Sequence, residues 1–453
     1  MTHRPHSVHR ILCMSQVILP LLAVLCLTLN GLHAADFDLA AAVRAAHANA
    51  VVQIPAGNYL VDGLEIPSGV TLKGSGYRST ILSAKGSVNG LVVRGDHVTI
   101  SDVSIIDAEE SGILVQGSSS VLVARILVHG CLSGLLATGS TGLRIENSIM
   151  AKNRRGAVIT ATSDSSLINC TMVDNQVLAV SGGKKVTVFN NVFTGSPTGV
   201  WIAKETVDLS LDANLYATNI IGNRSGDPAR ASLFGWRRLT EWDTHSIDLA
   251  VTYADPAGTD FHPTSRLAWD PTLATTSDWG LAELAGVRAP ALDIDGTKRQ
   301  GGVDLGAYEM SFPPPRPTDG VFNVTASQTL KSAAIYFPDG RMLTELFQNL
   351  PVPAGKHDFY FPSRDQSNQA IAPGSYELRL VESGLVNRYR GLAGNFAKSS
   401  NLADNCAWPE EMIAFDRQDR IYVLQNSFEN SQGVRAFDAA YEQPRWMMPG
   451  GSG

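Results

Sequence analysis

The stretch ISDVSIIDAEESGILVQGSSSVLVARILVHGCLSGLLATGS, residues 100–140, carries a pattern that repeats along much of the chain. A glycine before an apolar run recurs in three steps of 22 residues, at Gly90, Gly112, Gly134 and Gly156. One more step of 22 reaches Leu178, and 21 further is Gly199. A second landmark repeats in phase every 21 to 23 residues, in segments that begin at Ile100, Leu122, Ile145, Leu167, Val188 and Leu211. A period near 22, filled with short β-branched runs and Gly, Asn and Ser turns, predicts a solenoid.

Each repeat predicts strands and not a helix. Its apolar runs are short and partly alternating, as at Val186, Val188 and Val192, and no run has the length or the 3.6-residue period of a helix. A leucine-rich repeat of this length would show its own frame of leucines and asparagine, which is absent. A parallel β-helix fits better, because each coil pairs its backbone with the next and points rows of apolar side chains inward. We therefore predict an all-β parallel β-helix with one inward row at Ile100, Val123, Ile145, Leu167 and Val188.

Length, charge and the first residues limit the class of protein. The 453 residues exceed one ordinary domain, and a net charge of −7 without a basic cluster argues against nucleic acid as a partner. The chain begins with basic Arg4 and Arg10, an apolar run at residues 17–29 and two alanines at 34–35. This order is typical of a secretory signal peptide over residues 1–35. An uncleaved anchor is the alternative, but the run is short for a membrane span. We expect a secreted or cell-surface protein, a monomer with no membrane span after signal removal.

Removal of the signal leaves three cysteines, Cys131, Cys170 and Cys406. Their number is odd, and the separation of Cys131 from Cys170 is not a multiple of the repeat. We therefore expect no disulfide framework, although an exported protein could have one. The fold must then be stabilised by its core, with Cys170 as a buried small residue.

The segment before the repeats predicts a lid. In DFDLAAAVRAAHANA, residues 36–50, Asp36 or Asp38 can cap a short amphipathic helix that covers the exposed first coil. The next residues, VVQIPAGNYLVDGLEIPSGVTLKGSGYRSTIL, contain an IPAGNYLV-type strand and a VTLKGSG-type turn. This order resembles the opening segment of right-handed parallel β-helix proteins of the pectate-lyase-like superfamily. The resemblance implies a right-handed parallel β-helix over residues 36–310 and an extracellular polysaccharide as the partner.

After the last clear coil the regular period is lost. The stretch from LFGWRRLTEWDTHS onward is similar to the tail of secreted bacterial β-helix proteins. It ends in LDIDGTKRQGGVDLGAYE, residues 292–309, which we interpret as a hairpin that caps the last coil, with ion pairs among Arg299, Asp304 and Glu309. A metal site in the DIDG piece is the alternative, but the remaining oxygen ligands of an EF-hand loop are missing.

Three further parts follow the β-helix. SFPPPRPTDG, residues 311–320, predicts a stiff linker. Residues 321–385 contain a PDGR turn and the strands AGKHDFYF and IAPGSYELRL, and they resemble the Ig-like β-sandwich of the flagellar hook-cap type. We interpret this part as a spacer, with sugar binding as the alternative. Residues 391–453 resemble a single NHL-type propeller blade, which we interpret as a truncated propeller because one blade cannot bury its own faces.

Polar residues at the turn after the second landmark are the candidate site. Its eighth position holds Asp107, His129, Lys152 and Asp174 in four consecutive coils, and equivalent positions stack about 4.8 Å apart. Neighbouring turn positions add Glu109, Glu110, Asn153, Arg154 and Arg155. This ladder can contact a sugar chain that lies along the helix axis. The alternative is a solvated turn in which charges alternate because stacked like charges repel.

The ladder favours a polysaccharide lyase over a hydrolase. A lyase needs a base beside a uronate carboxylate and a cation to hold that carboxylate. We predict Lys152, His129 and Arg154 as base or clamp, and Asp107, Glu109, Asp174 and Arg155 as substrate-binding residues. A calcium ion is possible, held by the acidic members. Asp107 and Asp174 are three coils apart, about 14 Å by strand spacing, which is too far for a hydrolase pair.

Two functions therefore remain open. One is a secreted lyase-like enzyme that acts on an acidic polysaccharide, and its main support is the resemblance. The other is a non-catalytic glycan-binding or structural arm of a larger surface protein, which the appended Ig-like and propeller-like parts favour. The polygalacturonase Asn-Thr-Asp and Asp-Asp pattern is absent from the sequence.

Overall fold

The computed structural model describes residues 37–227, 229–230, 232–266, 275–300, 302–310, 320–325, 330–352, 354–359, 370–372 and 374–383, together with four strands between 412 and 449. The chain forms two compact units, Met1–Ser383 and Gly384–Gly453. The predicted signal peptide and nearly all of the Pro-rich linker lie outside the described residues. Within the described residues, no helix has both the length and the apolar character needed to cross a membrane.

The predicted lid helix is present as α1 (Leu39–Ala45). Asp38 is its N-cap, and the Asp38 Oδ1 atom accepts a hydrogen bond of 2.8 Å from the Ala41 amide. Leu39 and Val43 are buried in the same apolar core as the coils. An amphipathic turn of helix with its own cap therefore covers the start of the solenoid, as the sequence predicts.

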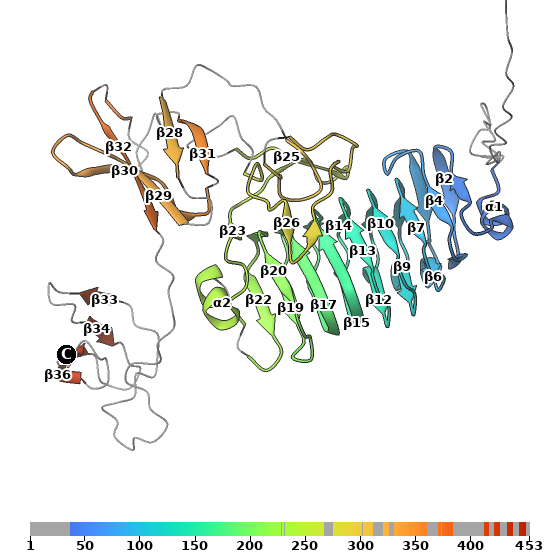
Figure 1. Cartoon of the computed structure of the whole chain (residues 1–453), viewed down its shortest axis with the longest axis horizontal. Coiled ribbons are helices and arrows are strands. Elements are labelled where there is room, and N and C mark those ends of the chain that lie inside the picture. The colour runs from blue at the N-terminus through green and yellow to red at the C-terminus, as the bar shows by residue number, and fades with distance from the viewer. Residues whose placement is uncertain are drawn as a thin grey trace, which may run out of the picture. The chain divides into compact units, whose positions relative to one another are not determined.

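The coils form two parallel sheets that run the length of the solenoid (Figure 1). The 14-stranded sheet comprises β1 (Val51–Gln53), β3 (Leu64–Ile66), β4 (Thr71–Lys73), β6 (Asn89–Val93), β7 (Thr99–Ser101), β9 (Ser111–Gln116), β10 (Leu122–Ala124), β12 (Ser133–Thr138), β13 (Arg144–Glu146), β15 (Arg155–Ile168), β17 (Leu178–Phe189), β19 (Thr198–Ile202), β20 (Ser210–Asp212) and β22 (Ile220–Arg224). The nine-stranded sheet comprises β2 (Gly57–Leu60), β5 (Thr80–Ser83), β8 (Ser104–Ile106), β11 (Leu127–His129), β14 (Ile149–Ala151), β16 (Thr171–Val173), β18 (Val192–Thr194), β21 (Leu215–Ala217) and β23 (Ile247–Asp248). Each strand pairs with its equivalent in the next coil, which confirms the parallel β-helix.

The predicted inward row is confirmed. Strand register pairs each member with the next, and all five are fully buried: Ile100, Val123, Ile145, Leu167 and Val188. The register also shows that the second landmark begins at Val123 in its coil and not at Leu122. The first step is therefore 23 residues long, and this one-residue difference matters for the candidate site.

The recurring glycines mark the narrowest part of the coil interior. Facing them is a row of the nine-stranded sheet that includes Val128 and Met150. A Cβ atom on Gly112 would lie 2.3 Å from Val128 Cγ1, and one on Gly134 would lie 3.1 Å from Met150 Cγ. Glycine leaves room for these side chains at Gly112 and Gly134, which explains its recurrence there.

Buried asparagines form ladders at the corners of the coils. Asn153 Oδ1 accepts a hydrogen bond from the Cys131 amide, and Asn175 Oδ1 accepts one from the Asn153 amide. A second ladder joins Asn191 to the amide of Cys170, which is buried with a free thiol, as predicted. Because each amide side chain satisfies backbone groups that the corner removes from sheet pairing, these polar residues are compatible with a dry interior.

The last coil is closed by α2 (Leu233–Thr240). Trp236 is fully buried, and a Cβ atom on Gly222 of the last coil would lie 2.7 Å from its ring. The Trp236 indole donates to Asp243 Oδ2 at 2.7 Å, and Asp243 also accepts from Asn214 and Tyr216. The hairpin at residues 292–309 therefore does not cap the last coil, contrary to the prediction.

The described residues of 249–310 (249–266, 275–300 and 302–310), here called the returning segment, instead lie along the outer face of the nine-stranded sheet. The segment contains β24 (Tyr253–Asp255), β25 (Asp260–Pro263), β26 (Glu283–Leu284) and β27 (Val287–Arg288). Its buried side chains share one apolar cluster with outward residues of β11, β14 and β16, comprising Tyr77, Leu127, Ile149, Ala151, Val173, Phe261, Ile294, Ala307 and Tyr308. In Figure 1 this segment, in olive and yellow, lies beside the middle coils. The outward face of β11, β14 and β16 is thus partly covered.

Antiparallel strands follow. In the first unit β28 (Gly320–Val324) pairs with β31 (Gly355–Phe359), and β29 (Leu330–Tyr336) lies between β30 (Met342–Leu350) and β32 (Glu377–Ser383). The Ig-like sandwich remains a prediction. In the second unit four antiparallel strands form one sheet, comprising β33 (Met412–Phe415), β34 (Ile421–Gln425), β35 (Gly433–Phe437) and β36 (Pro444–Pro449). The NHL-type blade also remains a prediction.

Candidate functional site

The predicted ladder is correct in three of its four positions and wrong at His129. His129 pairs with Ile106 in the preceding coil, so it lies one position earlier than Asp107. The ladder position in that coil is occupied by Gly130. The cause is the extra residue in the first step of the repeat, which shifts the second landmark by one.

The ladder is a stack of turns with left-handed backbone. The φ angles are +62° at Asp107, +75° at Gly130, and +54° at both Lys152 and Asp174. A Cβ atom on Gly130 would lie only 2.7 Å from Asp107 Oδ1. Each acidic side chain that leans over the next coil therefore favours a glycine there, and the same arrangement recurs between Asp174 and Gly195.

The structure brings three of the predicted site residues together, namely His129, Asp107 and Lys152. His129 is half-buried at the end of β11, and the charges of Asp107 and Lys152 act on it. Burial lowers the pKa of His129, Asp107 opposes that shift, and Lys152 adds to it. The Lys152 ammonium donates a 2.8 Å hydrogen bond to the Pro256 carbonyl of the returning segment. The other predicted residues lie on the same stack of turns, with Glu109, Arg154 and Asp174 exposed and Arg155 half-exposed.

A pocket of about 260 Å³ lies beside His129, between the nine-stranded sheet and the returning segment. The sheet side is formed by β5, β8, β11 and the turn before β5, and the other wall by the turn that precedes β25. Its lining residues are Tyr77, Arg78, Ile81, Ser104, Ile106, Leu127, His129, Gly258, Thr259 and Asp260. His129 is the one predicted site residue among them.

Arg78 is the cation of the pocket. Its side chain is 48% exposed, and its Nη2 atom donates to Asp260 Oδ1 at 3.1 Å. Its Nε atom donates to the Tyr77 hydroxyl at 2.9 Å. Burial raises the pKa of Tyr77 to about 12, so this hydroxyl is neutral at ordinary pH. The guanidinium is thus oriented from two sides and still faces solvent.

Behind the pocket wall, His262 lies between two carboxylates. Its Nδ1 atom is 2.5 Å from Asp260 Oδ1, and its Nε2 atom is 2.9 Å from Asp295 Oδ2. Its ring lies 4.0 Å from the Tyr308 ring, centroid to centroid. The hydrogen bond with Asp295 raises the pKa of His262, and the bond with Asp260 adds to the rise, although burial opposes it. At Asp260 and Asp295, burial opposes ionisation, but the contacts with His262 outweigh it and lower the pKa of both carboxyls.

Sequence reasoning missed this group because its members come from distant segments. Tyr77 and Asp295 are hydrogen-bonded although 218 residues separate them. Arg78 was part of the GYRST stretch that indicated only the fold, and His262 stands in the non-repeating DFHP stretch. The one available signal was the concentration of Asp and His in that stretch, and it did not indicate which coil the stretch covers.

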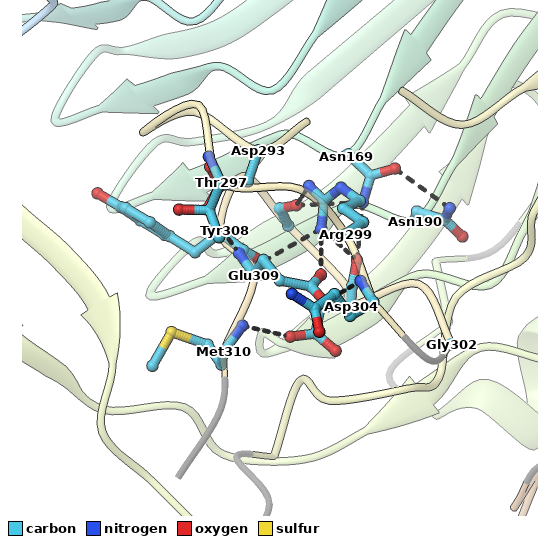
Figure 2. Close-up of polar contacts among 12 residues, drawn as sticks. Asn169, Asn190, Asp293, Thr297, Arg299, Gly302, Asp304, Tyr308, Glu309 and Met310 are labelled. Carbon is cyan, nitrogen blue, oxygen red and sulfur yellow. Dashed lines mark hydrogen bonds and ion pairs between the residues drawn. The ribbon is translucent and has the colours of Figure 1, made fainter. Parts of the chain in front are cut away.

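A second polar group, around Arg299, fixes the returning segment to the coils. Figure 2 shows the guanidinium pointing into a set of oxygen atoms. It forms an ion pair of 3.3 Å with Glu309, as predicted, and donates 3.0 Å to Asn147 Oδ1 of the solenoid. It contacts Asp304 through the backbone carbonyl. The Asp304 carboxylate instead accepts from the Met310 amide at 2.6 Å, and burial raises its pKa to about 8.

Within the hairpin, the Asp293 carboxylate accepts two backbone hydrogen bonds. Asp293 Oδ1 accepts 2.7 Å from the Thr297 amide, and Asp293 Oδ2 accepts 2.9 Å from the Glu309 amide. Within the part of the chain that the structure describes, no group of three or more His, Cys, Asp or Glu side chains is arranged to hold a metal ion. A calcium ion remains a prediction from the sequence.

Comparison with known proteins gives the class of the fold. A family model described as "Right handed beta helix region" matches residues 68–215, which lie within the coils. Together with the parallel strand pairing, this match identifies the solenoid as a right-handed parallel β-helix. No curated protein matches the chain.

Several solved structures are similar to part of the chain. The catalytic domain of an alpha-1,3-glucanase is 14% identical over 38% of this chain and 40% of that one, with a TM-score of 0.26. Pectin methylesterase from carrot is 12% identical over 47% of this chain and 84% of that one, with a TM-score of 0.27. A pectate lyase is 13% identical over 60% of this chain and 91% of that one, with a TM-score of 0.25. The chain thus spans less than half of the glucanase domain, and similarities this low assign no activity to it.

Proposed function

We propose that this is a secreted β-helix protein that binds an extracellular, acidic polysaccharide in the pocket between Arg78 and His129 and cleaves it as a lyase. The observation that carries the proposal is the pairing, in one open pocket of about 260 Å³, of a half-exposed guanidinium with an imidazole. A pocket somewhat below the usual range of roughly 300–1,000 Å³ suits one sugar unit of a longer chain.

The two side chains have complementary chemistry for elimination. Arg78 can pair with the carboxylate of a uronate and stabilise the charge that develops there in the transition state. His129 has a lowered pKa, so it is neutral at pH 7 and can accept the proton next to that carboxylate. Loss of this proton, formation of the C4–C5 double bond and breakage of the bond to the C4 oxygen complete the elimination, after which the leaving oxygen takes a proton.

The predicted ladder has a supporting role in this proposal. Asp107 and Lys152 adjust the proton affinity of His129 from the turns of the preceding and the following coil. Glu109, Arg154, Arg155 and Asp174 line the path of a sugar chain that leaves the pocket parallel to the solenoid axis. Lys152 would hold that path in place through its bond to the Pro256 carbonyl.

The alternative is a non-catalytic module that binds the same ligand. The observation that favours it is that both cations already have partners within the protein, since Arg78 donates to the Asp260 carboxylate and Lys152 to the Pro256 carbonyl. Such a pocket can hold a sugar. Without a free cation to stabilise the transition state, His129 alone would catalyse elimination slowly.

The test uses the full chain with polygalacturonate, alginate and a glycosaminoglycan, each with calcium or with a chelator, and a neutral glucan as control. Elimination is followed by ultraviolet absorbance of the unsaturated product, and binding by calorimetry. Arg78→Ala should weaken binding about tenfold or more, because a hydrogen bond to a charged group contributes about 1.5–3 kcal/mol. Arg94→Ala, which removes an exposed arginine paired with Glu65 and outside the pocket, is the matched control.

Three outcomes separate the readings. Product formation that His129→Gln abolishes, with binding retained, supports the lyase. Binding without product, lost in Arg78→Ala and kept in Arg94→Ala, supports the non-catalytic module. If none of the three acidic glycans binds, with or without calcium, both are wrong.

A further inference from the structure

We propose that His262, which does not itself line the pocket, is a positioning residue whose proton holds the pocket wall closed and leaves Arg78 available to an acidic ligand. The inference extends the proposed function and takes from it only the identity of the ligand, an acidic glycan. Its structural part concerns the wall itself and can be tested without any glycan.

The wall is a short piece of the returning segment. Gly258, Thr259 and Asp260 form it, and they continue directly into β25, where Phe261 is fully buried. On the far side of His262, Asp295 belongs to the turn of the hairpin and accepts 3.1 Å from the Tyr77 hydroxyl. His262 therefore joins two pieces of the returning segment, the wall and the hairpin turn, above the same tyrosine of the solenoid.

Protonation decides how many of these contacts can form at once. The imidazolium has two N–H groups, and both find a carboxylate: Nδ1 donates to Asp260 and Nε2 to Asp295. Neutral imidazole has one N–H group, so one ring nitrogen must then present its lone pair to a carboxylate oxygen at 2.5 or 2.9 Å. Loss of the proton thus replaces one attractive contact by a repulsive one.

The same proton sets the state of Arg78. The Arg78 Nη2 atom is 3.1 Å from Asp260 Oδ1 and also 3.1 Å from His262 Nδ1. With the imidazolium in place, His262 balances the charge of Asp260 and the guanidinium can attract a ligand carboxylate. With neutral His262, Arg78 is the one cation left beside Asp260. The Asp260 carboxylate then balances the charge of the guanidinium, which attracts a ligand carboxylate less strongly.

Among the groups that face His262, the two carboxylates outweigh the others and raise its pKa. Asp260 from its own strand and Asp295 from the hairpin raise its pKa, burial against Tyr308 opposes the rise, and Arg78 is the one cation in contact. The folded protein therefore binds this proton more tightly than the unfolded chain does. The stabilisation is fully present below the ordinary histidine pKa and is lost as pH rises through the raised value.

The first experiment measures the wall alone. Histidine ¹⁵N chemical shifts of the full chain, with His262 assigned by comparison with His262→Gln, should titrate above the ordinary value. Amide protection factors at residues 258–262, in which the intrinsic rise of exchange with pH is divided out, should fall over the same pH range, while those in β9 and β12 stay constant. Asp295→Asn should move both transitions to lower pH, and it keeps the test valid if His262→Gln folds poorly.

The second experiment adds the ligand. Binding of the acidic glycan should fall by up to tenfold per pH unit above the His262 transition, the limit for release of one proton. His262→Gln should remove this dependence, and His129→Gln, which changes the histidine that lines the pocket, should retain it.

The two experiments fail in different ways. If His262 titrates at or below its ordinary value, or if the protection factors at 258–262 are independent of pH, the inference is wrong whatever the glycan does. If both wall measurements behave as expected and no acidic glycan binds, the proposed function is wrong and the proton-dependent wall remains.

Discussion

The coils and the returning segment are built on opposite principles within one unit. In the coils, a buried side chain such as Ile145 has an equivalent above and below it, and the whole stack is one apolar core. The returning segment has no repeat, and besides one apolar cluster with the sheet it is positioned by single polar contacts such as those of Arg299 and His262. The regular part supplies a long, stable face, and the irregular part turns one stretch of that face into a pocket.

This difference should determine how far the loss of stability caused by a substitution extends along the chain. A lost contact in the coils removes apolar surface that neighbouring coils share, so its effect should be felt along the stack. A lost contact in the returning segment leaves the coils intact and frees one side of the pocket. Four substitutions test this comparison, from the largest expected effect to the smallest.

Of the four substitutions, Arg299→Ala should have the largest effect, and this effect should be a loss of stability in the returning segment. The guanidinium is almost fully buried, and its removal leaves Glu309 and several carbonyl oxygens without their donor. Breaking a buried ion pair typically costs about 3–5 kcal/mol. Hydrogen exchange should show lost protection at residues 292–309 with β9 and β12 unchanged. Arg288→Ala, at an exposed pair of the same segment, is the control and should stay within about 0.5 kcal/mol. Equal loss of protection in the coils would contradict the separation drawn above.

Ile145→Ala should destabilise the coils by about 2–5 kcal/mol, the usual cost of such a truncation in a core. Ile145 is fully buried between Val123 and Leu167. Chemical denaturation should show the loss, and exchange should increase in strands on both sides of β13. Val51→Ala, at a side chain that is 60% exposed, is the matched control. A loss of exchange protection that is confined to the returning segment would contradict this expectation.

Asn175→Ala tests the polar corner inside the same coils. Its side chain accepts from the Asn153 amide and donates 2.7 Å to the Met150 carbonyl, and all are buried. Leaving these groups unsatisfied should cost about 1–3 kcal/mol. Thermal denaturation measures the effect, with exposed Asn58→Ala as control. An unchanged melting temperature would mean that the ladder does not stabilise the corner.

Lys152→Ala should have the smallest effect on stability, under about 0.5 kcal/mol, because the side chain is exposed. The sequence-based hypothesis gives Lys152 a catalytic role, so any lyase activity should be lost, whereas the pocket proposal expects a modest, salt-sensitive weakening of glycan binding. Activity and binding at two salt concentrations distinguish the two. Full activity with full affinity would remove Lys152 from the site altogether.

Much of the fold could be predicted because it depends on short-range information. The 22-residue period, the inward row through Val123 and Ile145, and the cap at Asp38 each follow from residues close together in sequence or one coil apart. Buried Cys170 follows from the same reasoning. In a solenoid every coil contacts only its neighbours, so a local pattern is enough to determine the register.

The site was predictable only in part, and the limits have physical causes. The position of His129 depends on one extra residue in a single coil, and a shift of one residue changes which side chains stack. The pocket depends on which coils the returning segment covers, and nothing periodic in residues 249–310 encodes that choice. The sequence by itself determined the solenoid and its inward rows. The same apolar pattern occurs in every coil, so a preference that is weak in one coil is reinforced by the coils that pair with it. Only the tertiary structure decided that Arg78, His129, Asp260 and His262 meet, because single contacts such as Asn147 with Arg299 and Tyr77 with Asp295 join segments that no local pattern relates.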